Sequence, residues 1–265
     1  MVRRKIPRCD LRQIYDSGQC FRWQPQEDGS FVIPACGRTV RVAQQGDQFE
    51  FQCTSEEFER VWSTYFDLET DYEEIVHRVD PADAYLTKAV QYGFGLRILR
   101  QDVWEMIVTF LLSQNSNIPR IRKNLRDLCA LTDGQVPTPQ QLAARSEAEL
   151  RALGVGYRAR YLLGAGAFFS QYSPDDLYAL SYSEAHEMLR KCPGIGPKVA
   201  DCICLFGLHH VDAFPIDTHI RQILKAYYPN GFPLERYRGC AGILQQYMFY
   251  YDLRPVNCQT KCNRN

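Results

Sequence analysis

The chain has 265 residues, and its 31 lysine and arginine residues balance its 31 aspartate and glutamate residues, so the formal net charge is zero. A chain of this length can bury a large core, as one big domain or as two closely packed ones. The neutral balance argues against a protein that coats nucleic acid without specificity, but local basic clusters decide whether DNA is bound. Such clusters occur at residues 3–5 and 120–126, and the second is equally explained by a solvated helix face.

The first part of the chain predicts a small antiparallel sheet. Short apolar segments at residues 21–23, 31–33, 39–42 and 49–51 are separated by turn signals at 28–29, 36–37 and 45–47. Thr54 then begins a capping-box sequence, which predicts a helix through about Phe66.

From about Tyr72 the apolar spacing becomes helical and stays so. Residues 103–113 are strongly apolar and predict a central buried helix. Ser146 is a predicted cap for the next helix, and Ser181 or Ser183 for a later one. The remaining predicted helices span residues 158–172, 198–207, 218–227 and 235–251.

We therefore predict an α+β fold. A small N-terminal antiparallel β-sheet domain with a flanking helix (residues 1–75) packs on an α-helical domain (residues 76–265) with a helix-hairpin-helix motif at about residues 184–207. The composition around residues 70–95 is not that of a flexible linker, so the two parts are expected to pack tightly.

The predicted hairpin is the most informative segment. Its turn contains Gly194 and Gly196, which can take positive φ and let the chain reverse between two helices. Backbone N–H groups at such a turn, and at the start of the next helix, suit a phosphate oxygen. Lys198 lies in the first turn of that helix, and Asp217 is a predicted N-cap 19 residues later. A phosphate contact, a candidate amine nucleophile and a candidate carboxylate therefore occur in one short stretch.

Together these motifs resemble the helix-hairpin-helix DNA glycosylase superfamily, in which a hairpin, an optional lysine and a downstream aspartate form the active site. More narrowly, the chain resembles the 8-oxoguanine DNA glycosylase/AP lyases of the eukaryotic type. The resemblance runs in order through SGQCFRW at residues 17–23, NSNI at 115–118, GYRARY at 156–161 and Phe249. It implies excision of 8-oxoguanine, preferably opposite cytosine, from duplex DNA through a lysine Schiff base, followed by β-elimination. It also implies a monomer that needs no cofactor or membrane and that lies inside the cell with the DNA, in the cytoplasm or nucleoid of a prokaryote or the nucleus of a eukaryote.

The resemblance assigns the catalytic roles to Lys198 and Asp217. Lys198 attacks C1′ of the sugar, and its amine must be neutral to do so, so we expect its pKa to be lowered by the helix start and by burial. Asp217 would cap its helix and face the developing positive charge. His219 could reach a phosphate from the same helix start. The alternative for Lys198 is a surface lysine that binds phosphate. For Asp217 it is a helix cap with no other role, and for His219 an ordinary polar histidine.

The resemblance also implies a pocket for the extruded base. Cys202, one helical turn after Lys198, and Phe249 would pack on its two faces, and Gln245 would read its Watson–Crick edge. The backbone carbonyl of Gly18 would accept the N7 hydrogen of 8-oxoguanine, whereas the N7 of guanine is itself an acceptor. Considered singly, Cys202 and Phe249 are equally typical of core residues, and Gly18 of a turn glycine.

A second set implied by the resemblance reads the base left behind by flipping. Asn115 would enter the gap, Arg120 and Arg158 would contact the orphan cytosine, and Tyr157 would wedge beside it. The alternative for Asn115 is a helix C-cap, and the alternative for the two arginines is that they are surface charges. Ser116 departs from the family pattern, which often has consecutive asparagines, but Asn115 itself is retained.

The chain has 11 cysteines, an odd number, and they are scattered among apolar positions. Because no secretory signal begins the sequence either, we expect the cysteines to be reduced thiols. No apolar run is long enough to span a membrane. Cys240, Cys258 and Cys262 lie near the C-terminal end, but they are three, at a spacing unlike that of the four cysteines that hold an iron–sulfur cluster in related glycosylases, so no metal is expected. Two alternatives stay open, namely a helix-hairpin-helix glycosylase for another damaged base and a non-catalytic DNA-binding module.

Overall fold

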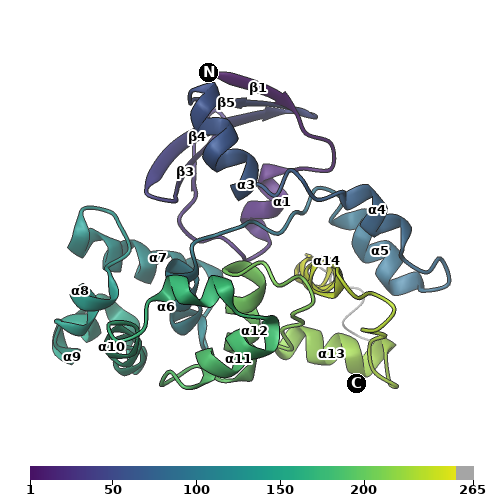
Figure 1. The fold of residues 1–265 in the computed structure, drawn as a ribbon. Helices are drawn as coiled ribbons and strands as arrows, with labels where there is room; N and C mark the ends of the chain where they lie inside the picture. The colour runs from purple at the N-terminus through teal and green to yellow at the C-terminus, as the bar shows by residue number, and fades with distance from the viewer. Residues whose placement is uncertain (255–265) are drawn as a thin grey trace.

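The N-terminal part is an antiparallel sheet, as expected. The structure, a computed structural model, describes residues 1–254. Five strands in the order β1-β5-β4-β3-β2 form the sheet (Figure 1). They are β1 (Val2–Lys5), β2 (Gln24–Pro25), β3 (Phe31–Ala35), β4 (Arg38–Gln45) and β5 (Gln48–Phe51). The predicted turns join β2 to β3, β3 to β4 and β4 to β5.

One face of this sheet is covered by short helices. Alternate residues of the central strands are buried, including Ile33, Val42 and Phe51, which is the pattern of a sheet with one apolar face. Helix α1 (Leu11–Asp16) and the continuous segment α2 (Ser55–Glu57), η1 (Phe58–Trp62) and α3 (Ser63–Tyr65) flank the sheet. Thr54 caps this segment by accepting the backbone N–H of Glu57, as predicted.

The N-terminal prediction was wrong at two points. Residues 21–23 do not form a strand. Phe21 belongs to the core of the helical part, and Arg22 forms a largely buried ion pair with Glu105 of that part, so the segment crosses between the two cores. Strand β1 and helix α1 were not predicted. Strand β1 carries three successive basic residues, and their pairing with β5 cannot be read from local pattern.

The rest of the chain is helical. The helices are α4 (Tyr72–His77), α5 (Ala84–Tyr92), α6 (Val103–Ser113), α7 (Ile118–Cys129), η2 (Ala130–Thr132), α8 (Pro139–Ala143), α9 (Glu147–Leu150), η3 (Arg151–Val155), α10 (Arg158–Phe169), η4 (Pro174–Ala179), α11 (Tyr182–Arg190), α12 (Pro197–Phe206), α13 (Thr218–Tyr227) and α14 (Ala241–Leu253). Helix α6 is buried along nearly its whole length, as predicted, and packs against α7, α10 and α12. Helix α14 begins at Ala241 rather than near residue 235, because residues 235–240 form turns.

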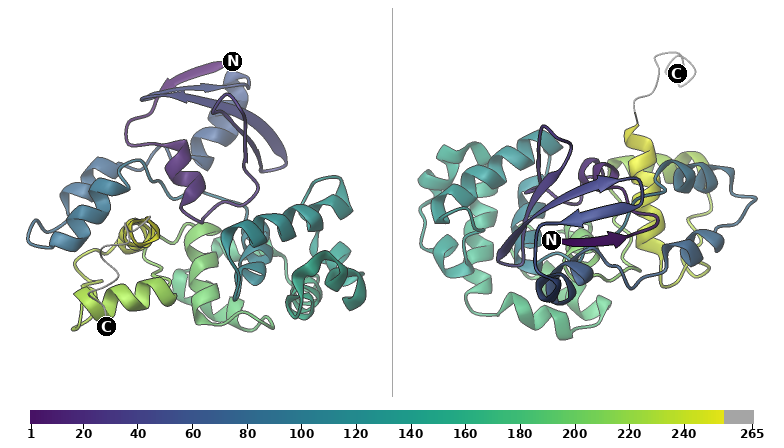
Figure 2. Two further views of the ribbon diagram at one scale, coloured as in Figure 1. Left: turned by 180° about the vertical axis from the view of Figure 1, so that it is seen from behind. Right: turned by 90° about the horizontal axis from the view of Figure 1, so that it is seen from above.

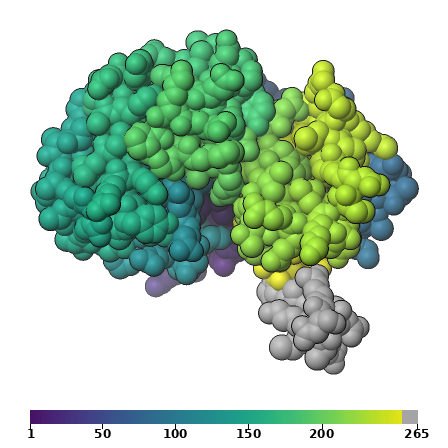
Figure 3. Space-filling model, turned by 90° about the horizontal axis from the view of Figure 1, so that it is seen from below, coloured from purple at the N-terminus to yellow at the C-terminus, as the bar shows by residue number. Residues whose placement is uncertain are grey.

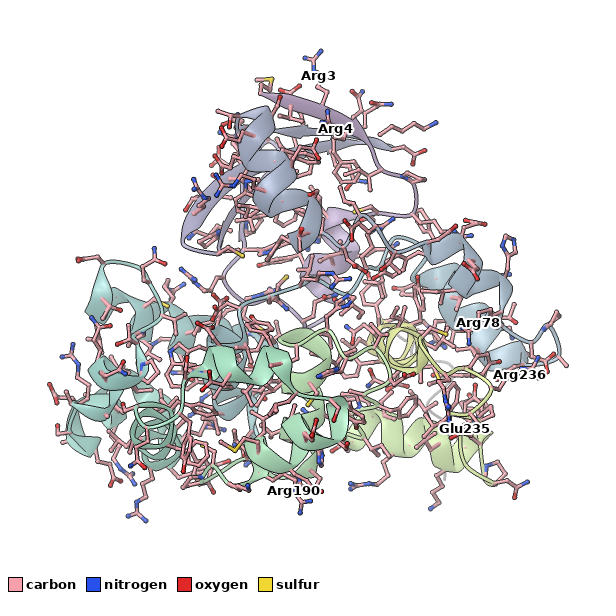
Figure 4. The ribbon with its side chains drawn as sticks, in the orientation of Figure 1. Arg3, Arg4, Arg78, Arg190, Glu235 and Arg236 are labelled. Carbon is pink, nitrogen blue, oxygen red and sulfur yellow. The ribbon has the colours of Figure 1, made fainter. Side chains whose placement is uncertain are left out.

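The helices form two groups below the sheet (Figure 2). Helices α7–α10 lie on one side, whereas α4 and α5 lie beside α13 and α14, although these pairs are far apart in the sequence. Arg78, which follows α4, donates to the backbone carbonyls of Arg236 and Arg238 ahead of α14, and Figure 4 shows Arg78 and Arg236 close together there. None of the helices in residues 1–254 combines the length and the apolar character that a membrane span requires.

A buried carboxylate joins the sheet to the helices. Asp67 accepts hydrogen bonds from the hydroxyls of Thr70 and Tyr72 and from the guanidinium of Arg100. The imidazole of His209, which follows α12, lies 3.3 Å from the same carboxylate. Burial by itself raises the pKa of this carboxyl, but His209 and the two hydroxyls outweigh it and hold the pKa at about 2. The boundary between domains at residue 75 stays a prediction.

Candidate active site and DNA-contact loops

The hairpin consists of α11, a turn at residues 191–196, and α12. Ser181, not Ser183, caps α11 through a capping box with Glu184. Gly194 has φ of +89°, and a Cβ atom there would lie 2.4 Å from Cγ of Tyr161, so both conformation and space require glycine. Gly196 has φ of −88° and is the N-cap of α12, so the expectation of positive φ was correct only for Gly194. Arg190, at the end of α11, points outward beside this turn (Figure 4).

The two hairpin helices are joined through Asp201 of α12. Its carboxylate accepts a 2.6 Å hydrogen bond from the hydroxyl of Tyr182 and lies 3.4 Å from Nε2 of His186, both on α11. These contacts fix α12 relative to α11 and therefore fix the direction in which the first turn of α12 presents its N–H groups. An anion at this helix start meets free N–H donors and the positive end of the helix dipole.

Lys198 is half-buried in the first turn of α12. Its Nζ lies 5.7 Å from the ring centroid of Phe110 on α6. Cys202 and the Asp217 carboxylate raise the pKa of the Lys198 ammonium, although burial acts to lower it. The direction is the opposite of the predicted one, because Cys202 on α12 and Asp217 at the start of α13 together outweigh burial.

Asp217 is an N-cap, as predicted. Its Oδ1 accepts the backbone N–H of Ile220 at 2.8 Å, which leaves the second carboxylate oxygen available. His219, two residues later, lies 2.8 Å through Nδ1 from Oδ2 of Asp252 on α14. Asp252 was not predicted. The only sequence signal for it is its position three residues after Phe249, on the same face of one helix.

Helix α14 presents Gln245 and Phe249 on one face. Nε2 of Gln245 donates to the carbonyl of Pro215 at 3.0 Å, whereas its Oε1 is buried and has no hydrogen-bond partner among the described residues. The Phe249 ring lies edge-on to the ring of His219, with centroids 5.5 Å apart. A buried amide oxygen without a partner is costly, so Oε1 of Gln245 is free to accept a hydrogen bond from a bound group.

Gly18 lies against this face from the N-terminal part. Its φ is +76°, and a Cβ atom there would lie 3.5 Å from Cε1 of Phe249. The loop around it is rigidly held, since the side chain of Gln19 is fully buried and hydrogen-bonded at both ends. Nε2 of Gln246 on α14 also donates to the Ser17 carbonyl at 2.7 Å. The backbone at Gly18 is thus fixed beside Phe249.

The second set of predicted residues gathers at the end of α6. Asn115 is exposed, with φ of +49°. Arg158 is only 3% exposed, and its guanidinium donates to the carbonyls of Gln114, Asn115 and Val155. Tyr157 is 43% exposed and donates to the Gln114 carbonyl at 3.3 Å. Arg120 is exposed and contacts the Gly154 carbonyl at 3.3 Å. Arg158 therefore holds the Asn115 loop in this state, whereas Arg120 is available to a ligand.

The molecule is hollowed between the hairpin region and the C-terminal helices (Figure 3). Residues of the N-terminal part, in purple, are visible at the bottom of this hollow, as expected if Gly18 forms part of its floor. Within residues 1–254, no group of three or more histidine, cysteine, aspartate or glutamate residues is placed to hold a metal ion. Cys258 and Cys262 lie outside the described residues.

Comparison with known proteins shows the family of this chain. Residues 108–232 match the HhH-GPD superfamily of base excision DNA repair proteins, which is the class that the hairpin and its lysine define. Residues 1–107 match the N-terminal domain of 8-oxoguanine DNA glycosylase. The chain belongs to the 8-oxoguanine DNA glycosylase family, whose members are N-glycosylase/DNA lyases.

Individual relatives support this membership. An N-glycosylase/DNA lyase of Saccharomyces cerevisiae is 30% identical over 82% of this chain and 68% of its own length. The corresponding Arabidopsis thaliana protein is also 30% identical, over 82% of this chain and 66% of its own length. The chain thus spans about two thirds of these curated relatives. A Clostridium acetobutylicum 8-oxoguanine glycosylase/lyase, solved with duplex DNA containing cytosine opposite 8-oxoguanine, superposes with a TM-score of 0.85, 34% identity and 92% coverage of both chains.

Proposed function

We propose that this chain excises 8-oxoguanine from duplex DNA and then nicks the strand, with Lys198 as the nucleophile. The general activity, that of a bifunctional DNA N-glycosylase/AP lyase, is the activity of its family. The observation that supports the proposed role most directly is that the Lys198 amine lies beside Cys202 and Asp217, behind the phosphate-binding turn of the hairpin.

The chemistry follows from that arrangement. The ammonium of Lys198 is protonated at rest, so it must lose a proton before its lone pair can form a bond to C1′. The glycosidic C1′–N bond breaks, its electron pair leaves with the base, and the base takes up a proton. The negative charge of Asp217 stabilises the positive charge that develops on the sugar. The nitrogen then loses a proton, and its lone pair forms a C=N double bond as the C1′–O4′ ring bond breaks and O4′ takes up a proton. This Schiff base acidifies the C2′ proton, whose loss breaks the C3′–O bond, expels the 3′ phosphate and nicks the strand.

We propose that Gln245, Cys202, Phe249 and Gly18 recognise the damaged base. The unpaired Oε1 of Gln245 can accept hydrogen bonds from the Watson–Crick edge of a purine. Phe249 and Cys202 would bound the two faces of the base. The Gly18 carbonyl would accept the N7 hydrogen of 8-oxoguanine and repel the bare N7 of guanine. The fixed loop around Gly18 supports this discrimination, because an oxygen that cannot move penalises the wrong base.

We propose that Asn115 and Arg120 read the orphan cytosine. Arg158 contributes by holding the loop that carries Asn115, and Tyr157 lies beside it as a wedge. Gly194, Gly196 and the helix start would bind the DNA phosphates, with His219 contributing at the start of α13. The proposed partner is duplex DNA that contains 8-oxoguanine. We also propose that the protein is a monomer and that it lies inside the cell with the DNA.

Borohydride trapping on 8-oxoguanine duplexes tests the catalytic proposal. The parent protein and a Lys191→Gln control, which alters an exposed lysine of the same hairpin, should both become covalently linked to DNA. Lys198→Gln should still bind the duplex but lose both excision and the cross-link. Cross-linking of Lys198→Gln at the parent level would refute the assignment.

A further inference from the structure

Gln114 connects two loops that the proposed function treats as separate. It is the C-cap of α6 and has an extended backbone, with φ of −60° and ψ of 124°. Its Nε2 donates to the backbone carbonyl of Gly194 at 3.0 Å, 80 positions further along the chain. Gly194 lies in the hairpin turn, four residues before Lys198. One amide group therefore ties the end of α6 to the turn that positions the amine.

The backbone of Gln114 is held just as firmly. Its carbonyl accepts hydrogen bonds from Nε and Nη2 of Arg158 and from the hydroxyl of Tyr157. Nη2 of Arg158 also donates to the next carbonyl, that of Asn115, at 2.7 Å. Because Arg158 is almost completely buried, its guanidinium cannot turn to water instead. A shift of Asn115 must therefore displace Gln114, and with it the acceptor at Gly194.

We propose that Gln114 is a positioning residue that couples the loop that carries Asn115 to the hairpin that carries Lys198. The identity of the orphan base would then alter the rate of the chemical step. This inference rests on the proposed function. It extends that function because opposite-base selectivity would then depend on a side chain that contacts neither base. The path consists of Asn115, the Gln114 amide and Gly194, and every link is a direct bond or a hydrogen bond.

The donor in this path can be removed without changing the length of the side chain. Gln114→Met leaves the Gly194 carbonyl without its partner, and Gln140→Met, at an exposed position on α8, is the matched control. The measurements are single-turnover excision rates with cytosine and with adenine opposite 8-oxoguanine, and the Kd for a duplex with an abasic analogue opposite cytosine. We expect the cytosine-to-adenine rate ratio of Gln114→Met to fall about fivefold, on the order of one hydrogen bond's contribution. The Kd should change less than about twofold, and the control should match the parent.

An unchanged cytosine-to-adenine rate ratio would overturn the proposal. If both rates then fell in proportion together with the melting temperature, Gln114 would be only a structural cap. Failure of the proposed function itself would be seen separately, as parent protein that lacks the Lys198-dependent cross-link.

Gln114→Glu provides a second test if Gln114→Met folds poorly. Its ionised carboxylate repels the Gly194 carbonyl, whereas its protonated form can donate to it, and an unperturbed glutamate has a pKa of about 4.3. The rate ratio should therefore be low at neutral pH and should recover as the pH falls through about 4.3. Taking the ratio of two rates in the same variant cancels the pH dependence common to both. A ratio that does not depend on pH would contradict the proposed coupling.

Discussion

Replacing Gly194 by alanine should disable the hairpin while leaving the rest of the fold in place. The residue has φ of +89°, where an L-residue other than glycine is strained by about 1–2 kcal/mol. The new Cβ would also lie 2.4–2.8 Å from three atoms of the Tyr161 side chain. Tyr161 packs edge-on against Tyr157, with ring centroids 5.7 Å apart. Because the Tyr157 hydroxyl donates to the Gln114 carbonyl, displacing Tyr161 should also disturb the loop that carries Asn115.

The two costs can be combined. Overpacking a well-filled site costs about 1–3 kcal/mol, so the total destabilisation should be about 2–5 kcal/mol. In a chain of this size that corresponds to a fall in melting temperature of roughly 4–20 °C, at about 2–4 °C per kcal/mol. The affinity for any duplex should fall as well, because the turn no longer presents its N–H groups in the right direction.

Gly196→Ala is the matched comparison. Gly196 has φ of −88°, and a Cβ atom there meets nothing within 4 Å, so only the loss of a good N-cap residue remains, on the order of 1 kcal/mol. Thermal unfolding and fluorescence anisotropy with undamaged and lesion-containing duplexes would measure both variants. Equal losses of stability in Gly194→Ala and Gly196→Ala would refute the argument from positive φ and the Tyr161 contact.

Three further predictions follow from the structure. Asp217→Asn keeps an oxygen for the cap, so stability should change by less than about 1 kcal/mol while single-turnover excision falls by orders of magnitude; a parallel fall in melting temperature and rate would make Asp217 only structural. Arg120→Met should reduce the preference for cytosine over adenine by about 1–3 kcal/mol in relative excision, and the parent's full preference would contradict its role. Because the pKa of Asp67 is lowered to about 2, its ionised carboxylate should contribute about 2 kcal/mol to the free energy of unfolding above pH 4. This contribution should be lost as the pH falls from about 4 to about 2. The stability difference between the parent and Asp67→Asn, measured by urea unfolding, should therefore narrow over that range.

Features that depend on neighbouring residues were predictable from the sequence. The buried helix α6, a serine cap for α11 (Ser181 or Ser183 in the prediction, Ser181 in the structure) and the cap at Asp217 are set by residues three or four positions apart, and all three are present. Features that depend on distant partners were not. Strand β1 exists only because β5 pairs with it, and Asp217 contributes to the raised pKa of the Lys198 ammonium only because α12 and the start of α13 meet.

The same distinction applies to the site. Family resemblance named Arg158 as a residue that reads the orphan base, but its hydrogen bonds to the carbonyls of Gln114 and Asn115 are tertiary contacts across more than 40 positions. The hydrogen bond between His219 and Asp252 likewise joins two helices that share no local pattern.

The hydrogen bond from Gln246 to the Ser17 carbonyl has a consequence for the order in which the protein acquires its activity. It joins residues 229 positions apart, so the Ser17–Gly18 loop cannot be fixed against α14 until α14 has been synthesised and has docked. Lys198 and the hairpin turn are made earlier. We therefore expect the proposed discrimination of the damaged base to be acquired after the proposed nucleophile is in place.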